Sequence, residues 1–142
     1  MEYVIINGPN LNLLGKREPG IYGDRSFEDY LQSLSQKFPE DKIHYEQYNV
    51  EGDIVTAIQK HGYDKAVRGI VLNAAAYTHT SIAIADAIAA IPKPVIAVHI
   101  SNIFAREEER RTDLLVSKCK GMICGLGLRG YELALMALMM EE

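Results

Sequence analysis

The stretch GIVLN at residues 69–73 has the composition of a β-strand that is buried on both of its faces. After a short polar segment the chain continues into TSIAIADAIAAI, residues 80–91, which is long enough and apolar enough for a helix. The same succession of an apolar strand and a helical pattern recurs toward both ends of the chain. Further strands are expected at residues 3–7, 43–48, 94–100 and 121–124, and further helices at residues 26–38, 52–62 and 129–140.

This alternation predicts a parallel sheet, because a strand, a crossover helix and the next parallel strand form one right-handed unit. We therefore expect a single α/β domain over residues 1–142, with a doubly wound, flavodoxin-like sheet of five parallel strands and helices on both faces. Ser26 is the expected N-cap of the first helix, and Gly62 is expected to close the second. The charged stretch AREEERRTD at residues 105–113 predicts a further helical turn.

The composition narrows the class of protein. The chain has 142 residues, of which 48% are hydrophobic and 24% charged, and its formal net charge is -4. This charge argues against nucleic acid or an anionic membrane as the main partner. No run approaches the roughly 18 apolar residues of a membrane helix, and the N-terminus lacks the pattern of a signal peptide. Cys119 and Cys124 are expected to be buried free thiols, so the sequence favours a cytoplasmic protein.

Polar side chains follow three of the expected strands. Ligands of doubly wound sheets bind beyond the carboxyl ends of the strands, so these side chains should meet at one edge of the sheet. The first strand ends at Asn7 and leads into Asn10, Arg17 and Tyr22; the third ends at Asn73 and leads into Tyr77, Thr78 and His79; the fourth contains His99 and leads into Ser101 and Asn102.

The segment REPGIYG at residues 17–23 cannot be regular helix or central strand, because proline and glycine interrupt it. Its Arg17 and Tyr22 are then either incidental residues of a surface loop or the functional groups of a site.

Three other interpretations of this topology are weaker. GLGLRG at residues 125–130 matches the dinucleotide-binding pattern, but the acidic residue expected about 20 positions later would lie beyond Glu142. Tight turning and close helix packing explain its glycines better. A response regulator would need an aspartate in place of Asn73. A flavin-binding protein would need a phosphate loop and aromatic walls, whereas Trp is absent and the long first loop carries Arg17.

Several motifs together closely resemble the type II 3-dehydroquinate dehydratases, and they occur in that family's order almost from end to end. The motifs are NGPNLNLLGKREPGIYG, NAAAYTHTSIAIADA, VHISN, AREEERR and GLGLRGYELAL. The resemblance implies a flavodoxin-like fold and a homododecamer built from trimers. It also implies conversion of 3-dehydroquinate to 3-dehydroshikimate in the shikimate pathway, which leads to chorismate and the aromatic amino acids. Neither a metal nor an organic cofactor is implied.

That reaction removes a proton beside a ketone, passes through an enolate and expels a hydroxyl group, so it needs a base, an enolate stabiliser and a general acid. By resemblance, Tyr22 is the base in its phenolate form, Arg17 is the cation beside it and His99 is the acid. Asn10 is implied to hold a water against the enolate oxygen; it could also cap the turn after Gly8 and Pro9. The residues implied to hold the substrate are Asn73, His79, the backbone of Ile100, Ser101 and Arg110.

The resemblance further implies that Asp86 reaches into the active site of an adjacent subunit; the alternative is a salt bridge within the chain. The helix at residues 80–91 is apolar nearly all round, which also indicates burial against a second subunit. In the charged stretch, Arg106 and Arg110 are four residues apart and would share a helix face. Arg111 is expected on the solvated face, where it can pair with Glu107.

The sequence departs from the family's pattern at three positions. Members commonly carry glutamate two residues before the catalytic histidine, where this chain has Ala97. Ala75 stands where glycine is usual, and Val50 where a polar residue is frequent. These changes favour the alternative function, a catalytically weak paralogue that binds a related cyclic hydroxy acid. The intact set of Asn10, Arg17, Tyr22 and His99 favours the working enzyme.

Overall fold

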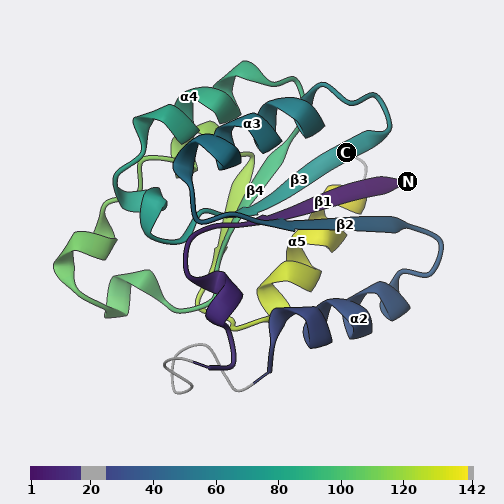
Figure 1. The fold of residues 1–142 in the computed structure, drawn as a ribbon, viewed down its shortest axis with the longest axis horizontal. Coiled ribbons are helices and arrows are strands. Elements are labelled where there is room, and N and C mark those ends of the chain that lie inside the picture. Colours follow the sequence, from purple (N-terminus) through teal and green to yellow (C-terminus); the bar gives the residue numbers. More distant parts are fainter. Residues whose placement is uncertain (17–24, 141–142) are drawn as a thin grey trace.

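The computed structural model describes residues 1–16 and 25–140, which form one parallel sheet with helices on both faces (Figure 1). The strands are β1 (Glu2–Asn7), β2 (Lys42–Gln47), β3 (Val67–Asn73), β4 (Val95–His99) and β5 (Gly121–Cys124). The helices are α2 (Phe27–Lys37), α3 (Glu51–Gly62), α4 (Ile82–Ala90) and α5 (Arg129–Met139). Short 3-10 turns are η1 (Leu11–Leu13), η2 (Ala75–His79), η3 (Ile103–Ala105), η4 (Glu108–Arg111) and η5 (Val116–Lys118). The strands and α-helices expected from the sequence are all present, within a residue or two of their expected bounds.

The strand order β2-β1-β3-β4-β5 places the topological switch point between β1 and β3. From β1 the chain moves outward to β2, whereas from β3 it moves outward in the other direction through β4 to β5. All neighbouring strands are parallel, and Asn7 at the end of β1 lies in register with Asn73 at the end of β3. This confirms the doubly wound, flavodoxin-like sheet, and it puts the expected ligand crevice at the carboxyl ends of these two strands.

Each face of the sheet has its own apolar core. On one face, Val4 and Ile6 of β1 pack with α3 and α4; on the other, Tyr3 and Ile5 pack with α2 and α5 (Figure 1). Because β1 is covered on both faces, it needs apolar residues at successive positions, which is why its sequence does not alternate. Full burial of each aliphatic side chain contributes about 1.5–3 kcal/mol to folding.

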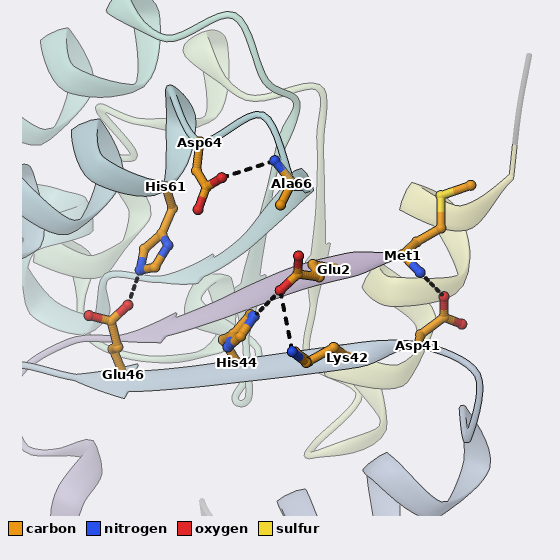
Figure 2. Close-up of polar contacts among 9 residues, drawn as sticks. All are labelled: Met1, Glu2, Asp41, Lys42, His44, Glu46, His61, Asp64 and Ala66. Carbon is orange, nitrogen blue, oxygen red and sulfur yellow. Dashed lines mark hydrogen bonds and ion pairs between the residues drawn. The ribbon is translucent and has the colours of Figure 1, made fainter.

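The outer strand β2 is fixed by polar contacts with β1 and α3 (Figure 2). Glu2 Oε1 lies 2.8 Å from His44 Nε2 and 3.9 Å from Lys42 Nζ. Glu46 accepts hydrogen bonds from the Tyr48 hydroxyl and from His61, near the end of α3. Burial acts to raise the pKa of Glu46, but the hydrogen bonds from Tyr48 and His61 outweigh it and hold that pKa below its ordinary value.

Gly62 is the last residue of α3, as expected, but it does not adopt the left-handed conformation that glycines at helix C-termini usually have. Its φ is not positive, and a Cβ at this position would lie only 2.4 Å from the Ile91 side chain. Close packing between α3 and the end of α4 therefore requires glycine here.

The charged stretch was expected as one helical turn, and the structure instead divides it. Arg106 is extended, with φ -104° and ψ -161°, between η3 and η4. Arg106 and Arg110 consequently do not share a helix face, although both line the same pocket. Glu107 pairs with Arg110, whose Nε lies 2.6 Å from Glu107 Oε2, and not with Arg111 as expected.

Within residues 1–16 and 25–140, every helix is too short or too polar to cross a membrane.

Candidate active site

A pocket lies at the carboxyl edge of the sheet, beside the switch point. It encloses about 530 Å³ of space, a volume that includes the part open to solvent. Seven of the residues expected at the site line this pocket: Asn10, Asn73, His79, His99, Ile100, Ser101 and Arg110. Its other lining residues are Pro9, Leu11, Ala75, Ala76, Ile103 and Arg106.

Asn73 lines the pocket and belongs to a buried chain of hydrogen bonds that ties three elements together. Asn73 Nδ2 donates to the Tyr131 hydroxyl over 2.8 Å, and that hydroxyl donates to Asn7 Oδ1 over 2.7 Å. The amide N–H of Gly8 also donates to the Asn73 carbonyl over 2.7 Å. Burial raises the pKa of Tyr131 far above its ordinary value, so the hydroxyl stays protonated and can donate. The ends of β1 and β3 are thereby held together by α5.

Part of the hydrogen-bonding capacity of the Asn73 side chain is already used. Its side-chain oxygen accepts from the amide N–H of Ala75 over 3.1 Å, and its nitrogen donates to Tyr131. An amide nitrogen has two hydrogens and an amide oxygen two lone pairs. One donor and one acceptor position therefore remain for a ligand.

His99 is the last residue of β4, and its imidazole is 5% exposed at the wall of the pocket. Its Nε2 lies 3.6 Å from Asp113 Oδ2, and the Asp113 side chain is 6% exposed. The other oxygen of Asp113 accepts from the amide N–H groups of Leu115 and Val116, over 2.8 and 2.9 Å. Burial acts to raise the pKa of Asp113, but His99 and these two N–H groups hold it below its ordinary value. The pair therefore combines an ionised carboxylate with an imidazole in a dry environment.

The end of β4 is held by the loop that opens α5. Gly125 N donates to the His99 carbonyl, and Gly127 N to the Ile100 carbonyl, each over 3.0 Å. Both glycines have positive φ, 88° and 67°, and a Cβ at Gly130 would lie 3.3 Å from Val98. Tight turning and close packing thus explain the GLGLRG motif, as the sequence suggested.

Cationic and polar groups line the pocket beside His99. Arg110 is half-buried and pairs with Glu107, and Arg106 donates to Ser101 Oγ over 3.4 Å. His79 Nδ1 donates a hydrogen bond to the Thr112 carbonyl over 2.7 Å. Within residues 1–16 and 25–140 its Nε2 has no hydrogen bond, so this nitrogen is the one that can bind a ligand. This arrangement can hold an anionic, hydroxylated ligand, because arginine binds carboxylates and the neutral polar groups can bind hydroxyls.

Comparison with known proteins identifies the family. A model described as Dehydroquinase class II matches residues 1–139. The chain belongs to the class II dehydroquinase family. A protein of Exiguobacterium sp. named 3-dehydroquinate dehydratase is 50% identical over 139 residues, which are 97% of this chain and 94% of the relative. The crystal structure of a type II dehydroquinase from Butyrivibrio crossotus superposes with a TM-score of 0.94 at 40% identity, covering 99% of this chain and 98% of the other. A type II dehydroquinase from Propionibacterium acnes gives a TM-score of 0.90 at 41% identity, covering 96% and 94%.

Three of the residues expected at the dehydroquinase site remain. Two of them, Arg17 and Tyr22, lie outside the described part of the chain. Asp86 is on the exposed side of α4, away from the pocket of its own chain. Within residues 1–16 and 25–140 Asp86 has no ion pair or hydrogen bond, so the salt bridge considered as an alternative does not form among them.

One face of α4 is covered by its own chain and the opposite face is exposed, so the expected burial against a second subunit stays a prediction. Ile84, Ala85, Ala87 and Ile88 face the core, whereas Ile82 is 68% exposed. The opposite face presents Ile82, Ala83, Ala89 and Ala90 around Asp86.

Asn10 lies at the N-cap position directly before η1, and its side chain makes no capping hydrogen bond. Its amide N–H donates to Asn49 Oδ1 over 3.0 Å, and its side chain lines the pocket. The alternative in which the Asn10 side chain caps this turn is therefore wrong for the described residues.

Sequence reasoning did not find the contact of Tyr131 with Asn73 or that of Asp113 with His99. Tyr131 and Asp113 come from distant segments that carry no local signal of the contact. Cys119 and Cys124 are free thiols as expected, but half-buried. Among the described residues, no three His, Cys, Asp or Glu side chains lie close enough together to hold a metal ion.

Proposed function

We propose that the chain dehydrates 3-dehydroquinate to 3-dehydroshikimate in this pocket, with Tyr22 as base and His99 as general acid. The activity itself follows from family membership: the chain is a 3-dehydroquinate dehydratase of type II, a hydro-lyase. The assignment of residues is supported chiefly by one observation. Residues from the ends of β1, β3 and β4, chosen from the sequence, line a single pocket with His99 in its wall.

In the first step, the Tyr22 phenolate removes the proton from the carbon beside the ketone, and the electron pair moves to the ketone oxygen as an enolate. Asn10 holds a water against that oxygen. In the second step the enolate re-forms the ketone, the carbon–oxygen bond of the departing hydroxyl breaks, and His99 gives that hydroxyl its proton. The products are the enone and water.

The phenolate needs support, since a free tyrosine titrates near pH 10. For the tyrosine to be half ionised at pH 7, its pKa must be lowered by about 3. This corresponds to roughly 4 kcal/mol of stabilisation of the phenolate relative to the neutral phenol. One guanidinium about 4 Å away contributes on the order of 4 kcal/mol at an effective dielectric constant of 20. Arg17 is assigned this role. Desolvation acts in the opposite direction, so a second cation or hydrogen-bond donor is needed as well.

The ground-state contacts are assigned to the remaining lining residues. Arg110 and the amide of Ile100 with Ser101 hold the carboxylate and a hydroxyl of the substrate, and Asn73 with His79 holds the other hydroxyls. The Ile100 carbonyl already accepts from the Gly127 N–H, and the N–H of Ile100 is the group assigned to the ligand.

We further propose a homododecamer built from trimers, in which Asp86 of one subunit contacts the substrate or the Arg17 region of its neighbour. The exposed apolar residues around Asp86 support a subunit contact on this face of α4. The expected location is the cytoplasm, and the expected pathway is the shikimate pathway. No metal or organic cofactor is assigned to the reaction.

The test is to mix the purified protein with 3-dehydroquinate and follow the ultraviolet absorbance of the conjugated enone. We expect turnover without added metal and in the presence of a chelator. A folded protein that binds the substrate without forming the enone would instead be the weak paralogue, which nothing in the comparisons supports. The Tyr22→Phe variant provides the control for the residue assignment, because it should bind a substrate-like acid within a few fold while losing turnover.

A further inference from the structure

The carboxylate of Asp113 is aimed at the imidazole of His99 by its own hydrogen bonds. The two amide N–H groups that bind Asp113 Oδ1, from Leu115 and Val116, fix the carboxylate in orientation. The remaining oxygen, Oδ2, and Nε2 of His99 are both buried, and neither has a hydrogen-bond partner within residues 1–16 and 25–140. Their separation of 3.6 Å is an ion-pair distance. Two buried polar atoms that face each other and have no other partner satisfy each other's charge.

The segment that carries Asp113 is itself attached to the wall of the pocket. Leu114 N donates to the Thr78 carbonyl over 2.9 Å, and the Thr112 carbonyl binds His79 Nδ1 over 2.7 Å. These contacts lie on either side of Asp113 in the sequence. The carboxylate therefore does not depend on a freely moving loop for its position.

Strand β4 offers His99 no carboxylate of its own. The side chain on the same face two residues earlier is the methyl group of Ala97, which is buried between Leu72 of β3 and Met122 of β5. Asp113 approaches His99 from a different segment, between η4 and η5.

We propose that Asp113 is the positioning residue of the general acid: it orients the His99 ring and favours the protonated form that the reaction consumes. This inference rests on the proposed function, because it assigns Asp113 a role through His99. A carboxylate at ion-pair distance favours the charged imidazolium over the neutral ring. Since Asp113 itself is held in its ionised form, the effect is present at neutral pH.

Other titratable or charged groups near the pair have to be kept constant in any test. His79, Arg106 and Arg110 line the same pocket, Cys124 is in register with His99 on β5, and Cys119 lies near Asp113. The variant Asp113→Asn changes none of them. It also keeps a side-chain oxygen to accept from Leu115 and Val116, so it removes the charge with little change in shape.

The first measurement is the titration of the four histidines, His44, His61, His79 and His99, by NMR in wild type and in Asp113→Asn. We expect the His99 ring to lose its proton at lower pH in the variant than in wild type, while the other three histidines behave as in wild type. Asp64→Asn is the matched control. Its carboxylate also accepts a backbone N–H, that of Ala66, but in the turn before β3, at the opposite edge of the sheet (Figure 2).

The second measurement is the pH dependence of kcat. A general acid must be protonated, so kcat is lost as pH rises through the titration of His99, and Asp113→Asn should move this alkaline limb to lower pH by the same amount. We expect kcat at neutral pH to fall about tenfold with KM changed less than threefold.

The outcomes separate the possibilities. An unchanged His99 titration overturns the pairing, and a shifted titration with an unmoved pH profile overturns the positioning role. If the wild type forms no enone from 3-dehydroquinate, the proposed function fails, and the NMR titration still decides whether Asp113 controls the protonation of His99.

Discussion

At the scale of single residues, the backbone beside the pocket is held in an unusual conformation. Asn10 and Ala75 both have positive φ, 71° and 52°. The left-handed region costs about 1–2 kcal/mol for a residue with a Cβ, and asparagine tolerates it better than alanine does. The usual glycine at position 75 is thus explained by conformation, and the Ala75 methyl group is accommodated at the edge of the α2 and α5 core.

We expect Ala75→Gly to leave the free energy of unfolding unchanged or to raise it by up to about 1 kcal/mol, because relief of strain is partly offset by the entropy of glycine. Urea unfolding measures this. The neighbouring change Ala76→Gly is the control, since Ala76 has no positive φ and should lose about 0.5–1 kcal/mol. Equal losses in the two variants would contradict the strain argument.

His99→Gln should remove the proton that the departing hydroxyl requires. We expect kcat to fall by roughly 10²–10⁴-fold while KM stays within a few fold. Steady-state assays of enone formation give both constants. His44→Gln, on the outer strand β2, should change kcat less than twofold; if the two variants lose activity alike, His99 is not the acid.

At the scale of elements, the pocket depends on how closely the ends of β1 and β3 approach. A Cβ at Gly8 would lie 2.7 Å from the carbonyl oxygen of Ala74 and 2.8 Å from its carbon. These are backbone atoms, so a side chain at position 8 must push the two strand ends apart. The hydrogen-bond chain of Asn7, Asn73 and Tyr131 lies directly at this contact.

Gly8→Ala should therefore destabilise the fold by about 1–3 kcal/mol and also raise KM, because Asn73 and Asn10 move apart. The stability is measured by urea unfolding and KM by the enone assay. Gly52→Ala is the matched control, since nothing lies within 4 Å of a Cβ there and the position is helical. A Gly8→Ala variant with wild-type stability would show that the strand ends adapt without cost.

Much of the arrangement of strands and helices could be predicted from the sequence. Runs such as GIVLN predict strands because a sheet covered on both faces needs continuous apolar residues, and the carboxyl-edge rule then places Asn73 and His99 together. The family resemblance supplied the roles. The contact between Asp113 and His99 could not be predicted, because it depends on how an irregular segment of 3-10 turns folds back onto β4.

At the scale of the whole molecule, the acid stability of the sheet depends on its outer strand. The hydrogen bonds from Tyr48 and His61 hold the pKa of Glu46 below its ordinary value. A carboxyl with a lowered pKa in the folded state stabilises the fold above its ordinary pKa, and this contribution is lost as the pH falls through the folded-state value.

Glu46→Gln should accordingly lower the free energy of unfolding by about 1 kcal/mol at pH 7, after allowance for partial exposure, and by less at pH 4. Urea unfolding at both pH values measures the difference. Glu40→Gln, in an exposed turn, should have little effect at either pH. A deficit that does not depend on pH would mean that the carboxylate contributes through packing alone.

The proposed assembly predicts complementation between inactive variants. Asp86→Ala and Tyr22→Phe should each be folded and inactive, and mixing them after dissociation should restore activity in about a quarter of the sites. Those sites pair an intact Asp86 with an intact Tyr22 of a neighbouring subunit. Native mass spectrometry verifies that hybrids form. Hybrids with no recovered activity would show that Asp86 does not act across the subunit boundary.

The hydrogen bonds that Gly125 and Gly127 donate, and the one that the Tyr131 hydroxyl accepts from Asn73, have a consequence for biosynthesis on the ribosome. These groups hold the carbonyls of His99 and Ile100 and the amide of Asn73, yet they are translated after all the candidate catalytic residues. A nascent chain that has emerged only as far as Lys120 thus contains every reactive side chain but lacks the groups that fix them in place. Catalytic competence is therefore expected to appear late in synthesis, when β5 and α5 leave the exit tunnel.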